Sequence, residues 1–328
     1  MGTINLHRIV YSFQALRLLM LAKKFLTIVI VTPSFKPDFE RCQLLCQSIE
    51  QFVSPPVNHV LVVDRRDLLL FRQLENSYTE VVTVEELLPW WISRLPFVKK
   101  AWVSLRTPPI RNWLLQQIIK IQMARQMSGD VAVYIDSDVT FVRPFDFQHL
   151  VQGQLVRLYD EPGGNPESMA DLGMPHILWH QESSRLLGLP ATPMPAPDYV
   201  GNLITWRKDN VYKMCDRIEE VSGTDWVQTL GKQWHLSEYT LYGTFVDRIL
   251  GEDCGHYREL NKICHDYFTP TPLSNAELRQ FLSKIHPDQV AVMIASKAGM
   301  PVSEYKHLLL PLANTFDAAD LHQKLVLI

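Results

Sequence analysis

The sequence has few cysteines and a small net charge, and both features exclude classes of protein. Five cysteines in 328 residues are an odd number without zinc-finger spacing, which favours free buried thiols in a reducing compartment over a disulfide framework. The formal net charge is only -3, so no overall basic field indicates a nucleic-acid partner. Internal repeats and low-complexity segments are also missing. With 47% hydrophobic and 20% charged residues, the chain has the composition of a globular protein with a sizeable core.

Long hydrophobic runs are missing as well. Residues 4–31 are apolar in patches, but basic residues interrupt them before the roughly 18–20 residues that a membrane span needs. The interrupting residues are Arg8, Arg17, Lys23 and Lys24. The segment also has no small-residue cleavage site of the kind that ends a signal peptide. We expect a cytoplasmic protein with an amphipathic helix at residues 8–22, suited to peripheral contact with the cytoplasmic face of a membrane through residues 8–24. Alternatively, translation starts at Met20 and residues 1–19 are an upstream extension.

Two aspartates follow the most regular apolar run of the sequence. Residues 131–135 are rich in β-branched side chains, as in a buried parallel strand, and the segment Asp136-Ser137-Asp138 comes directly after them. Side chains two apart on a strand point to the same side, so both carboxylates can reach one ion. Hard cations such as Mg²⁺ and Mn²⁺ take carboxylate and phosphate oxygens. An isolated Asp-x-Asp is usually a solvated turn. Because ligands of open α/β sheets bind beyond the carboxyl ends of the strands, this segment is instead expected to hold a metal and a diphosphate.

Strand and helix patterns alternate from Phe25 onward, which predicts an α/β fold with a mixed, mainly parallel sheet flanked by helices. We expect strands at residues 25–31, 59–64, 81–84, 131–135, 199–206 and 289–296. We expect helices at residues 37–51, 65–74, 112–127 and 209–221. Residues 88–109 have no clear pattern. Residues 160–198 are rich in Gly, Pro and Met, which predicts a long binding loop with Trp179 and His180 available to a sugar.

A second motif lies between Trp234 and Val246. Ser237 can cap a helix whose first turn contains Glu238, where the helix dipole favours a carboxylate. Glu238 is then either a plain capping residue or a partly desolvated base. Aromatic side chains of the motif suit either the faces of sugar rings or a core: Trp234, Tyr239 and Tyr242. At the end of the last strand, Lys297 either contacts a phosphate or is solvated.

Three segments together carry a family resemblance: Gln116-Gln117-x-x-Lys120, Asp136-Ser137-Asp138, and Ser237-Glu238-Tyr239 with Leu241-Tyr242-Gly243. Over residues 25–300 the chain resembles the GT-A glycosyltransferases, and more narrowly an uncharacterised bacterial glycosyltransferase-like family. The resemblance implies a Rossmann-like GT-A fold. It also implies one catalytic domain, with a nucleotide-binding half at 25–150 and an acceptor half at 151–300. Residues 1–24 are then an N-terminal amphipathic extension, and residues 301–328 a peripheral C-terminal tail.

The resemblance also implies roles for single residues. The donor side would comprise Thr32, Pro33 and Ser34 at the nucleotide, Asp64 at the base or ribose, Lys120 at the diphosphate or sugar, and Gly201 and Asn202 below the sugar. Glu238 would deprotonate the acceptor hydroxyl of an inverting enzyme. The third metal ligand would be a late histidine or carboxylate, with His256, His265 and His286 as the histidine candidates. Apart from Gly201 and Asn202, these positions also have structural alternatives: a strand-ending turn, a helix cap, a solvated lysine, or a core or surface histidine.

The sequence therefore predicts a hexosyltransferase-like enzyme that uses Mn²⁺ or Mg²⁺ to transfer a sugar from a nucleotide-diphosphate sugar to an acceptor hydroxyl. Cell-surface polysaccharide or glycan synthesis is the expected context. Two alternatives stay open. A metal-dependent nucleotidyltransferase also uses paired carboxylates, but it favours a Gly-rich basic loop, and the stretch TPSFKPDF after the first strand has only Lys36. A non-catalytic carbohydrate-binding relative would keep the fold without the reaction.

Overall fold

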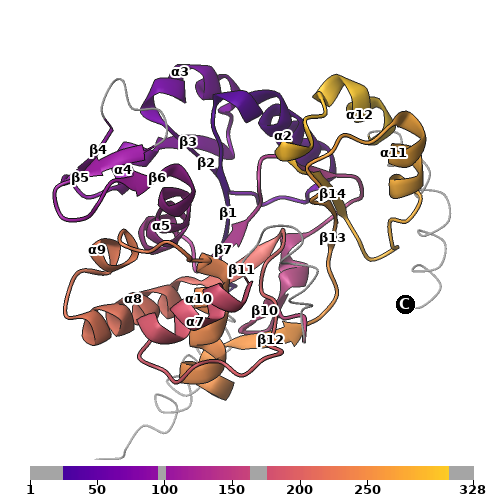
Figure 1. The fold of residues 1–328 in the computed structure, drawn as a ribbon. Helices are drawn as coiled ribbons and strands as arrows, with labels where there is room; N and C mark the ends of the chain where they lie inside the picture. Colours follow the sequence, from indigo (N-terminus) through magenta and orange to yellow (C-terminus); the bar gives the residue numbers. More distant parts are fainter. Residues whose placement is uncertain (1–24, 95–100, 163–175, 310–328) are drawn as a thin grey trace, which may run out of the picture.

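The computed structural model describes residues 25–94, 101–162 and 176–309, and a five-stranded sheet lies at its centre (Figure 1). The order of this sheet is β11-β7-β1-β2-β3. Its strands are β1 (Ile28–Pro33), β2 (His59–Val63), β3 (Thr79–Thr83), β7 (Val131–Tyr134) and β11 (Ile204–Arg207). Strands β7, β1, β2 and β3 are parallel, and β11 pairs with β7 in the antiparallel sense. The protein is thus a mixed α/β protein, as the alternating pattern predicted.

Helices cover both faces of this sheet because its strands are apolar on both sides. The helices are α2 (Phe39–Phe52), α3 (Leu68–Phe71), α4 (Val84–Leu87), α5 (Asn112–Gln126), α7 (His176–Leu186), α8 (Lys208–Ser222), α9 (Trp226–Leu230), α10 (Glu238–Phe245), α11 (Asn275–Leu282) and α12 (Val302–Leu309). Val29 and Val31 of β1 belong to one core cluster with residues of α5, α8 and α10. Ile28 and Ile30 belong to a second cluster with residues of α2. In Figure 1, α8 and α10 accordingly lie below the central strands and α2 above them.

Three smaller sheets surround the centre. They contain β4 (Ile92–Ser93), β5 (Ala101–Ser104) and β6 (Ile110–Arg111); β9 (Val151–Gln152), β10 (Leu155–Tyr159) and β12 (His256–Glu259); and β8 (Val139–Phe141), β13 (Cys264–Tyr267) and β14 (Ala291–Ile294). The last of these sheets adjoins the Asp136-Ser137-Asp138 segment. Strand β8 begins one residue after Asp138, and β14 pairs with it in the antiparallel sense. The late part of the chain therefore returns to the Asp-Ser-Asp segment.

The prediction of a loop over residues 160–198 is wrong for its central part, because α7 lies there. Residues 176, 179, 180, 183 and 184 are buried, which is the spacing of one helix face. Trp179 is 5% exposed and His180 is 1% exposed, so they are core residues and not sugar contacts. Flanking Gly and Pro residues hid this period in the sequence. Residues 163–175 of the predicted loop lie outside the described residues.

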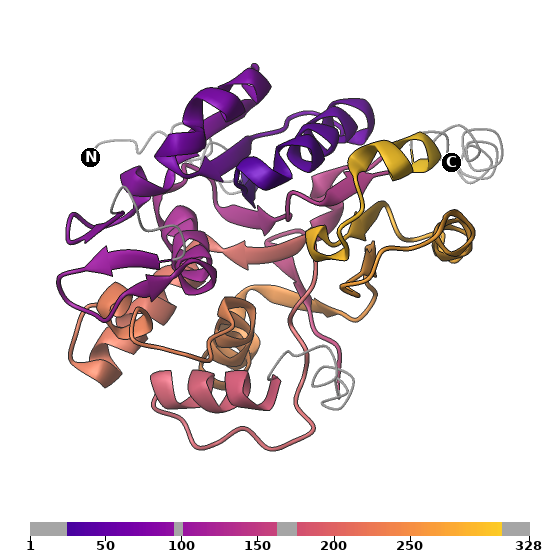
Figure 2. The ribbon, with the colours of Figure 1, turned by 45° about the horizontal axis from the view of Figure 1, so that its top comes forward.

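The described start of the predicted C-terminal tail is packed rather than peripheral. Val302, Tyr305 and Leu309 of α12 are buried in a core cluster with Leu44 of α2. Figure 2 shows the yellow α12 beside the indigo α2. The predicted helix at residues 8–22 and the tail beyond residue 309 lie outside the described residues.

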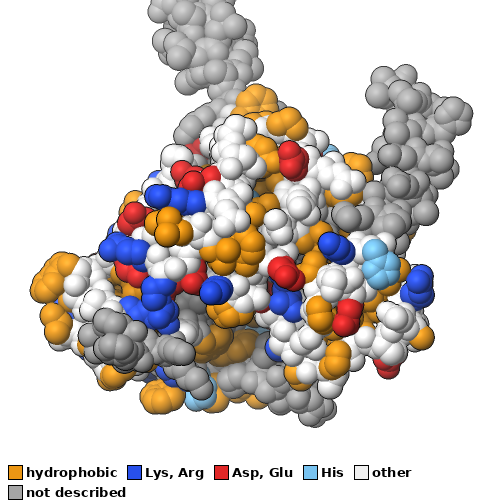
Figure 3. Space-filling model, turned by 90° about the horizontal axis from the view of Figure 1, so that it is seen from above, with side chains coloured by type: hydrophobic (Ala, Val, Ile, Leu, Met, Phe, Trp, Pro, Cys, Tyr) orange, Lys and Arg blue, Asp and Glu red, His pale blue; other side chains and the backbone are white. Residues whose placement is uncertain are grey.

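Three general expectations can be compared with the molecule. All five cysteines are free and buried, as predicted. Charged side chains of both signs are interspersed over the face in Figure 3, in keeping with the small net charge. Within residues 25–94, 101–162 and 176–309, no helix is both long and apolar enough to cross a membrane.

Candidate functional site

The candidate site lies at the carboxyl edge of the central sheet. Strands β2 and β3 extend the sheet on one side of β1, whereas β7 lies on the other side. The strand order therefore reverses at β1. Such a reversal leaves a crevice outside the carboxyl ends of the strands, where ligands of α/β proteins bind. Thr32 and Pro33 end β1, Asp64 follows β2, and Asp136 follows β7. Sequence order and sheet topology therefore bring the predicted donor-side residues to one edge.

Lys120 of α5 is at the centre of this site. Its Nζ lies 3.0 Å from Oε1 of Glu238 and 3.6 Å from Oδ1 of Asp136. The same Nζ donates a 2.8 Å hydrogen bond to the hydroxyl of Tyr239. Burial opposes the charge on Lys120, but Glu238, Tyr239 and Asp136 outweigh it and raise the pKa of Lys120 well above its ordinary value. The solvated-lysine alternative is wrong, because Lys120 is 4% exposed and joins the three motifs.

Local hydrogen bonds fix Glu238 in this position. The Ser237 side chain accepts a 3.2 Å hydrogen bond from the Thr240 backbone N–H and so caps α10, as predicted. The backbone N–H of Glu238 donates to Oε1 of Gln117 at 3.1 Å, which ties the start of α10 to α5. Gln117 and Ser237 thus hold the backbone of the first turn of α10, and Glu238 in that turn is buried. We call the group of Lys120, Asp136, Glu238 and Tyr239 the lysine cluster.

Asp138 is held by the returning late strand. Its Oδ2 accepts a 2.8 Å hydrogen bond from the backbone N–H of Ser296, just after β14. Burial, together with the nearby charge of Asp136, raises the pKa of Asp138 to about 7. A cation bound nearby would favour the ionised carboxylate that this environment disfavours. Ser137 between the two aspartates is buried, and Lys297 is exposed beside Ser296.

Asn202 connects Asp136 to Asp266, a carboxylate that no sequence motif predicts. The Asn202 Oδ1 accepts from the backbone N–H of Asp136 at 3.4 Å, and its Nδ2 donates to Oδ1 of Asp266 at 3.1 Å. Burial raises the pKa of Asp266. Leu203, directly after Asn202, has a φ of 57°, which L residues adopt rarely outside special sites. No recognisable motif surrounds Asp266 in the sequence, so only the pairing of β13 with β14 reveals it.

Asp136 and Asp138 are the residues that could hold a cation. Oδ1 of Asp136 is buried and accepts no hydrogen bond among the described residues; its charged neighbour is the Lys120 ammonium at 3.6 Å, so this oxygen already faces a cation. Within residues 25–94, 101–162 and 176–309, no three His, Cys, Asp or Glu side chains gather closely enough to form a metal centre alone. This set still fits Mg²⁺, which commonly takes one or two carboxylates and completes its shell with water and substrate phosphates.

The candidate histidines for a third ligand have other partners. His256 bonds the Tyr242 hydroxyl, with 2.7 Å between its Nε2 and the oxygen. His265 Nε2 lies 3.0 Å from the carbonyl of Phe281. His286 is at the surface, 3.3 Å from Asp288. We therefore assign none of these three residues to the acidic site.

The predicted nucleotide side contains engaged and unengaged groups. Thr32 is buried with its hydroxyl 3.0 Å from Nε2 of His59, whereas the Ser34 hydroxyl has no partner among the described residues. Asp64 accepts from the backbone N–H of Arg66 at 3.0 Å, which is the helix-cap alternative. Its carboxylate also pairs with Arg94 at 2.6 Å and with the Arg66 guanidinium. Asp64 would need to exchange these arginines to bind a ribose or base.

One predicted sugar contact, Tyr242, is not available in this arrangement. Tyr242 is fully buried, stacks on Trp206 with 4.8 Å between ring centroids, and accepts a hydrogen bond from the backbone N–H of Arg207. It is a core residue, so the prediction of a sugar contact is wrong. Gly243 beside it serves packing, because a Cβ there would lie 2.3 Å from the Tyr199 ring. Trp234 is 70% exposed, with the Arg111 guanidinium 4.3 Å from its ring centroid.

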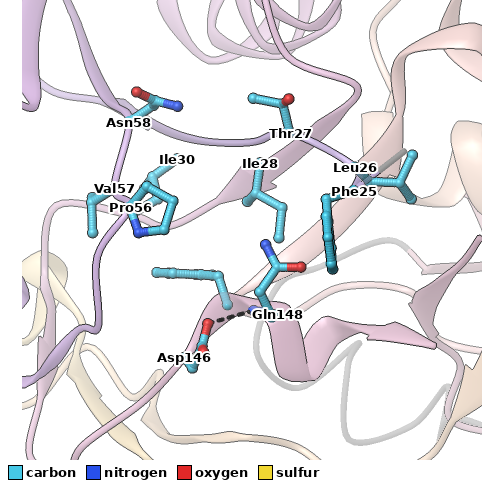
Figure 4. Close-up of a pocket in the computed structure, with 11 residues that line it drawn as sticks. Phe25, Leu26, Thr27, Ile28, Ile30, Pro56, Val57, Asn58, Asp146 and Gln148 are labelled. Atoms are coloured by element: carbon cyan, nitrogen blue, oxygen red, sulfur yellow. Dashed lines mark hydrogen bonds between the residues drawn. The ribbon is translucent and has the colours of Figure 1, made fainter. Parts of the chain in front are cut away.

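A separate cavity of about 150 Å³ lies at the opposite end of β1 (Figure 4). Thr27 and Asn58, which precede β1 and β2, are among its lining residues. The side chain of Gln148 points into it, and the Gln148 backbone N–H donates to Asp146 at 2.8 Å. Because these residues lie at the amino ends of the strands, the cavity is distinct from the acidic site.

The fold and the site define an α/β protein with paired carboxylates and a buried lysine at one edge of its central sheet. The chain belongs to a family of unknown function, DUF6492, whose model matches residues 23–269. Comparison with curated proteins finds no match. The matched range includes Lys120, Asp136, Asp138, Glu238 and Asp266, but it ends before β14 and Ser296.

Proposed function

We propose that this protein is a metal-dependent glycosyltransferase of GT-A type, which transfers a sugar from a nucleotide-diphosphate sugar to an acceptor hydroxyl. The observation that carries the proposal is the lysine cluster, in which one buried ammonium lies within 3.6 Å of both Asp136 and Glu238. These residues come from three separate motifs of the sequence. A site with adjacent metal-binding and base-like carboxylates suits transfer to a hydroxyl.

The order of the parallel strands supports the fold assignment. The parallel strands of the central sheet are β1, β2, β3 and β7. Numbered 1 to 4 in chain order, they lie in the sheet as 3-2-1-4, and the Asp136-Ser137-Asp138 segment follows strand 4. Doubly wound nucleotide-binding folds share this order and bind their ligands at the point where it reverses. Asp136 and Asp138 lie at that point, where a nucleotide diphosphate would be expected.

The chain's own residues would divide the chemistry between them. Asp136 and Asp138 would hold Mn²⁺ or Mg²⁺, which when bound neutralises the charge of the leaving diphosphate. Lys120 adds a fixed positive charge beside Asp136. Glu238 would accept the proton of the acceptor hydroxyl in an inverting reaction, as positive charge develops at the anomeric carbon. In a retaining reaction Glu238 would bind the acceptor instead.

Thermal unfolding with a panel of nucleotide diphosphates and their sugars, with and without Mn²⁺, tests the donor site. A ligand at 100 times its Kd stabilises the native state by about 2.7 kcal/mol, so one nucleotide should raise the Tm when Mn²⁺ is present. Asp138→Asn should abolish this rise. Asp288→Asn, which removes an exposed carboxylate elsewhere, should retain it. If no nucleotide gives a metal-dependent rise, the proposal is wrong.

The product of donor turnover distinguishes the proposal from its alternatives. Release of the nucleoside diphosphate is expected of a glycosyltransferase, including during slow hydrolysis without acceptor. Release of pyrophosphate would identify a nucleotidyltransferase. Metal-dependent donor binding without any turnover in the presence of an acceptor panel would favour the non-catalytic relative.

A further inference from the structure

Arg157 of β10 is a buried cation with incomplete hydrogen bonding. Its side chain is almost inaccessible, because the residue is 3% exposed. Nη2 donates to the carbonyl of Asn261 at 2.6 Å, but Nε and Nη1 have no acceptor among the described residues. Burial lowers the pKa of Arg157, yet a guanidinium retains its charge at any ordinary pH. A buried charge with unsatisfied donors costs folding free energy. An acceptor that bonds to Nε and Nη1 of Arg157 would remove this cost.

Arg157 lines a small cleft that adjoins the acidic site. The other lining residues are Tyr159, Gly201, Asn202, Lys262, Cys264 and Asp266. Asn202 is the residue that contacts the backbone of Asp136, so one wall of the cleft is shared with the proposed donor site. The cleft has a volume of about 10 Å³, which is room for one group of the size of a water molecule.

A second cation lies at the rim of the cleft. The Lys262 side chain is 40% exposed, and its Nζ is 5.8 Å from the centroid of the Tyr159 ring. Its ion pair with Glu161 is long, at 3.4 Å, and the Glu161 side chain is 48% exposed. Such a surface pair contributes little and can yield Lys262 to another anion. The cleft thus has a buried cation inside and a displaceable one at its mouth.

We propose that the cleft of Arg157 and Lys262 binds an oxyanion of the substrate, and that the donor is therefore a nucleotide-diphosphate sugar with an acidic group, such as a uronic acid. This inference rests on the proposed function and names the class of its donor. Glu259 lies near enough to favour the charged form of Arg157, but Nε and Nη1 of Arg157 donate to no acceptor among the described residues. An oxyanion would form charge-assisted hydrogen bonds with the guanidinium, and the small volume admits an oxygen of a carboxylate or phosphate group.

Asp266 in the same cleft is compatible with an anion. Its Oδ1 accepts from Asn202, and its Oδ2 has no partner among the described residues. Burial raises the pKa of Asp266 and so weakens the preference of this carboxyl for its charged form. A protonated Oδ2 could donate to the substrate oxyanion rather than repel it.

The experiment compares UDP-glucuronate with UDP-glucose, and GDP-mannuronate with GDP-mannose, by calorimetry on the full chain with Mn²⁺. For the nucleotide that the protein accepts, the acidic donor should bind at least about tenfold more tightly than the neutral donor, a difference of about 1.4 kcal/mol, because the oxyanion forms charge-assisted hydrogen bonds in the cleft. Lys262→Gln should reduce this preference, and Arg157→Gln should abolish it. Lys284→Gln, an exposed lysine outside the cleft, should leave it intact. Lys262→Gln provides the test where Arg157→Gln does not fold.

The outcomes separate this inference from the proposed function. Equal binding of the acidic and neutral donors, or a preference that survives both cleft variants, would overturn the inference and leave the proposed function standing. Free glucuronate, glucose and inorganic phosphate, tested by thermal unfolding without metal, provide a second comparison. Stabilisation by glucuronate alone that is lost in Lys262→Gln supports the cleft even where no nucleotide binds. Stabilisation by phosphate in place of glucuronate, without donor preference, would overturn the assignment of an acidic donor.

Discussion

At the scale of single residues, Lys120 determines both the charge and the stability of the site. The side chains of Lys120 and Glu238 are 6% and 7% exposed, so neither charge has water as an alternative partner. Lys120→Met keeps the length of the side chain but leaves Glu238 buried without a cation. Loss of one partner of a buried ion pair typically costs about 3–5 kcal/mol, and we expect a loss of that size in urea unfolding.

The double variant Lys120→Met with Glu238→Gln checks this explanation. Glutamine carries no charge, so the double variant should recover part of the stability that Lys120→Met loses. If both variants unfold at the same urea concentration, the two side chains are not coupled and the cost lies elsewhere in the packing of Lys120.

His256 makes a second prediction at this scale, because its ring bonds specify the neutral form. Nδ1 lies 2.9 Å from the carbonyl of Val156, to which it donates, and Nε2 accepts from the Tyr242 hydroxyl. Burial lowers the pKa of His256 to about 4. The folded state therefore binds fewer protons than the unfolded state, whose histidine pKa is about 6.5, and stability falls as pH decreases between these values.

The contribution of one such histidine is about 1.4 kcal/mol per pH unit within that window. Unfolding by urea at pH values from 4 to 7 should therefore show a flatter pH profile for His256→Gln than for the wild type. His286→Gln removes a histidine whose side chain is 67% exposed and should keep the wild-type slope. Parallel profiles for all three proteins would contradict the assignment of a neutral buried His256.

At the scale of elements, the cap of α10 links helix stability to the site. Removal of a serine N-cap costs typically about 1 kcal/mol. Ser237→Ala should lose that amount and also loosen the first turn that carries Glu238, so donor binding or turnover should fall as well. Ser274→Ala removes an equivalent cap from α11, whose start is exposed. It should lose similar stability without loss of donor binding or turnover, and an equal functional loss in both variants would contradict a specific role for the α10 cap.

Elements also show what a single sequence can and cannot predict. The strand before Asp136 and the cap at Ser237 depend on residues that are neighbours in the chain. The sequence pattern could therefore predict both. The contact of Lys120 with Glu238 joins residues 118 apart in number and depends on how α5 packs against α10. The same limit applies to Asp266, which reaches Asn202 only through the pairing of separate strands. Helix α7 was not predicted because its buried face includes two histidines and two serines, which give no apolar period, and because Gly and Pro residues flank it.

At the scale of the whole molecule, the site draws on more of the chain than the family match covers. The matched residues end at 269, but Ser296 donates to Asp138 and β14 pairs with β8. The long-range pairing of these strands makes the late segment part of the same folding unit as the acidic site. A boundary placed at the end of the family match would therefore separate Asp138 from its backbone donor.

Tyr305 of α12 tests this unity, because it lies beyond the family match and is 2% exposed. Tyr305→Ala leaves a cavity between α12 and α2, and aromatic truncations in a core cost about 3–5 kcal/mol. We expect a loss in this range by urea unfolding, in one cooperative transition that also removes the metal-dependent stabilisation by nucleotide. His307→Ala, on the exposed face of the same helix, should change stability by less than about 0.5 kcal/mol. Should Tyr305→Ala behave like His307→Ala, or should α12 melt in a separate transition, the late segment would be an appendage to a domain that ends near residue 269.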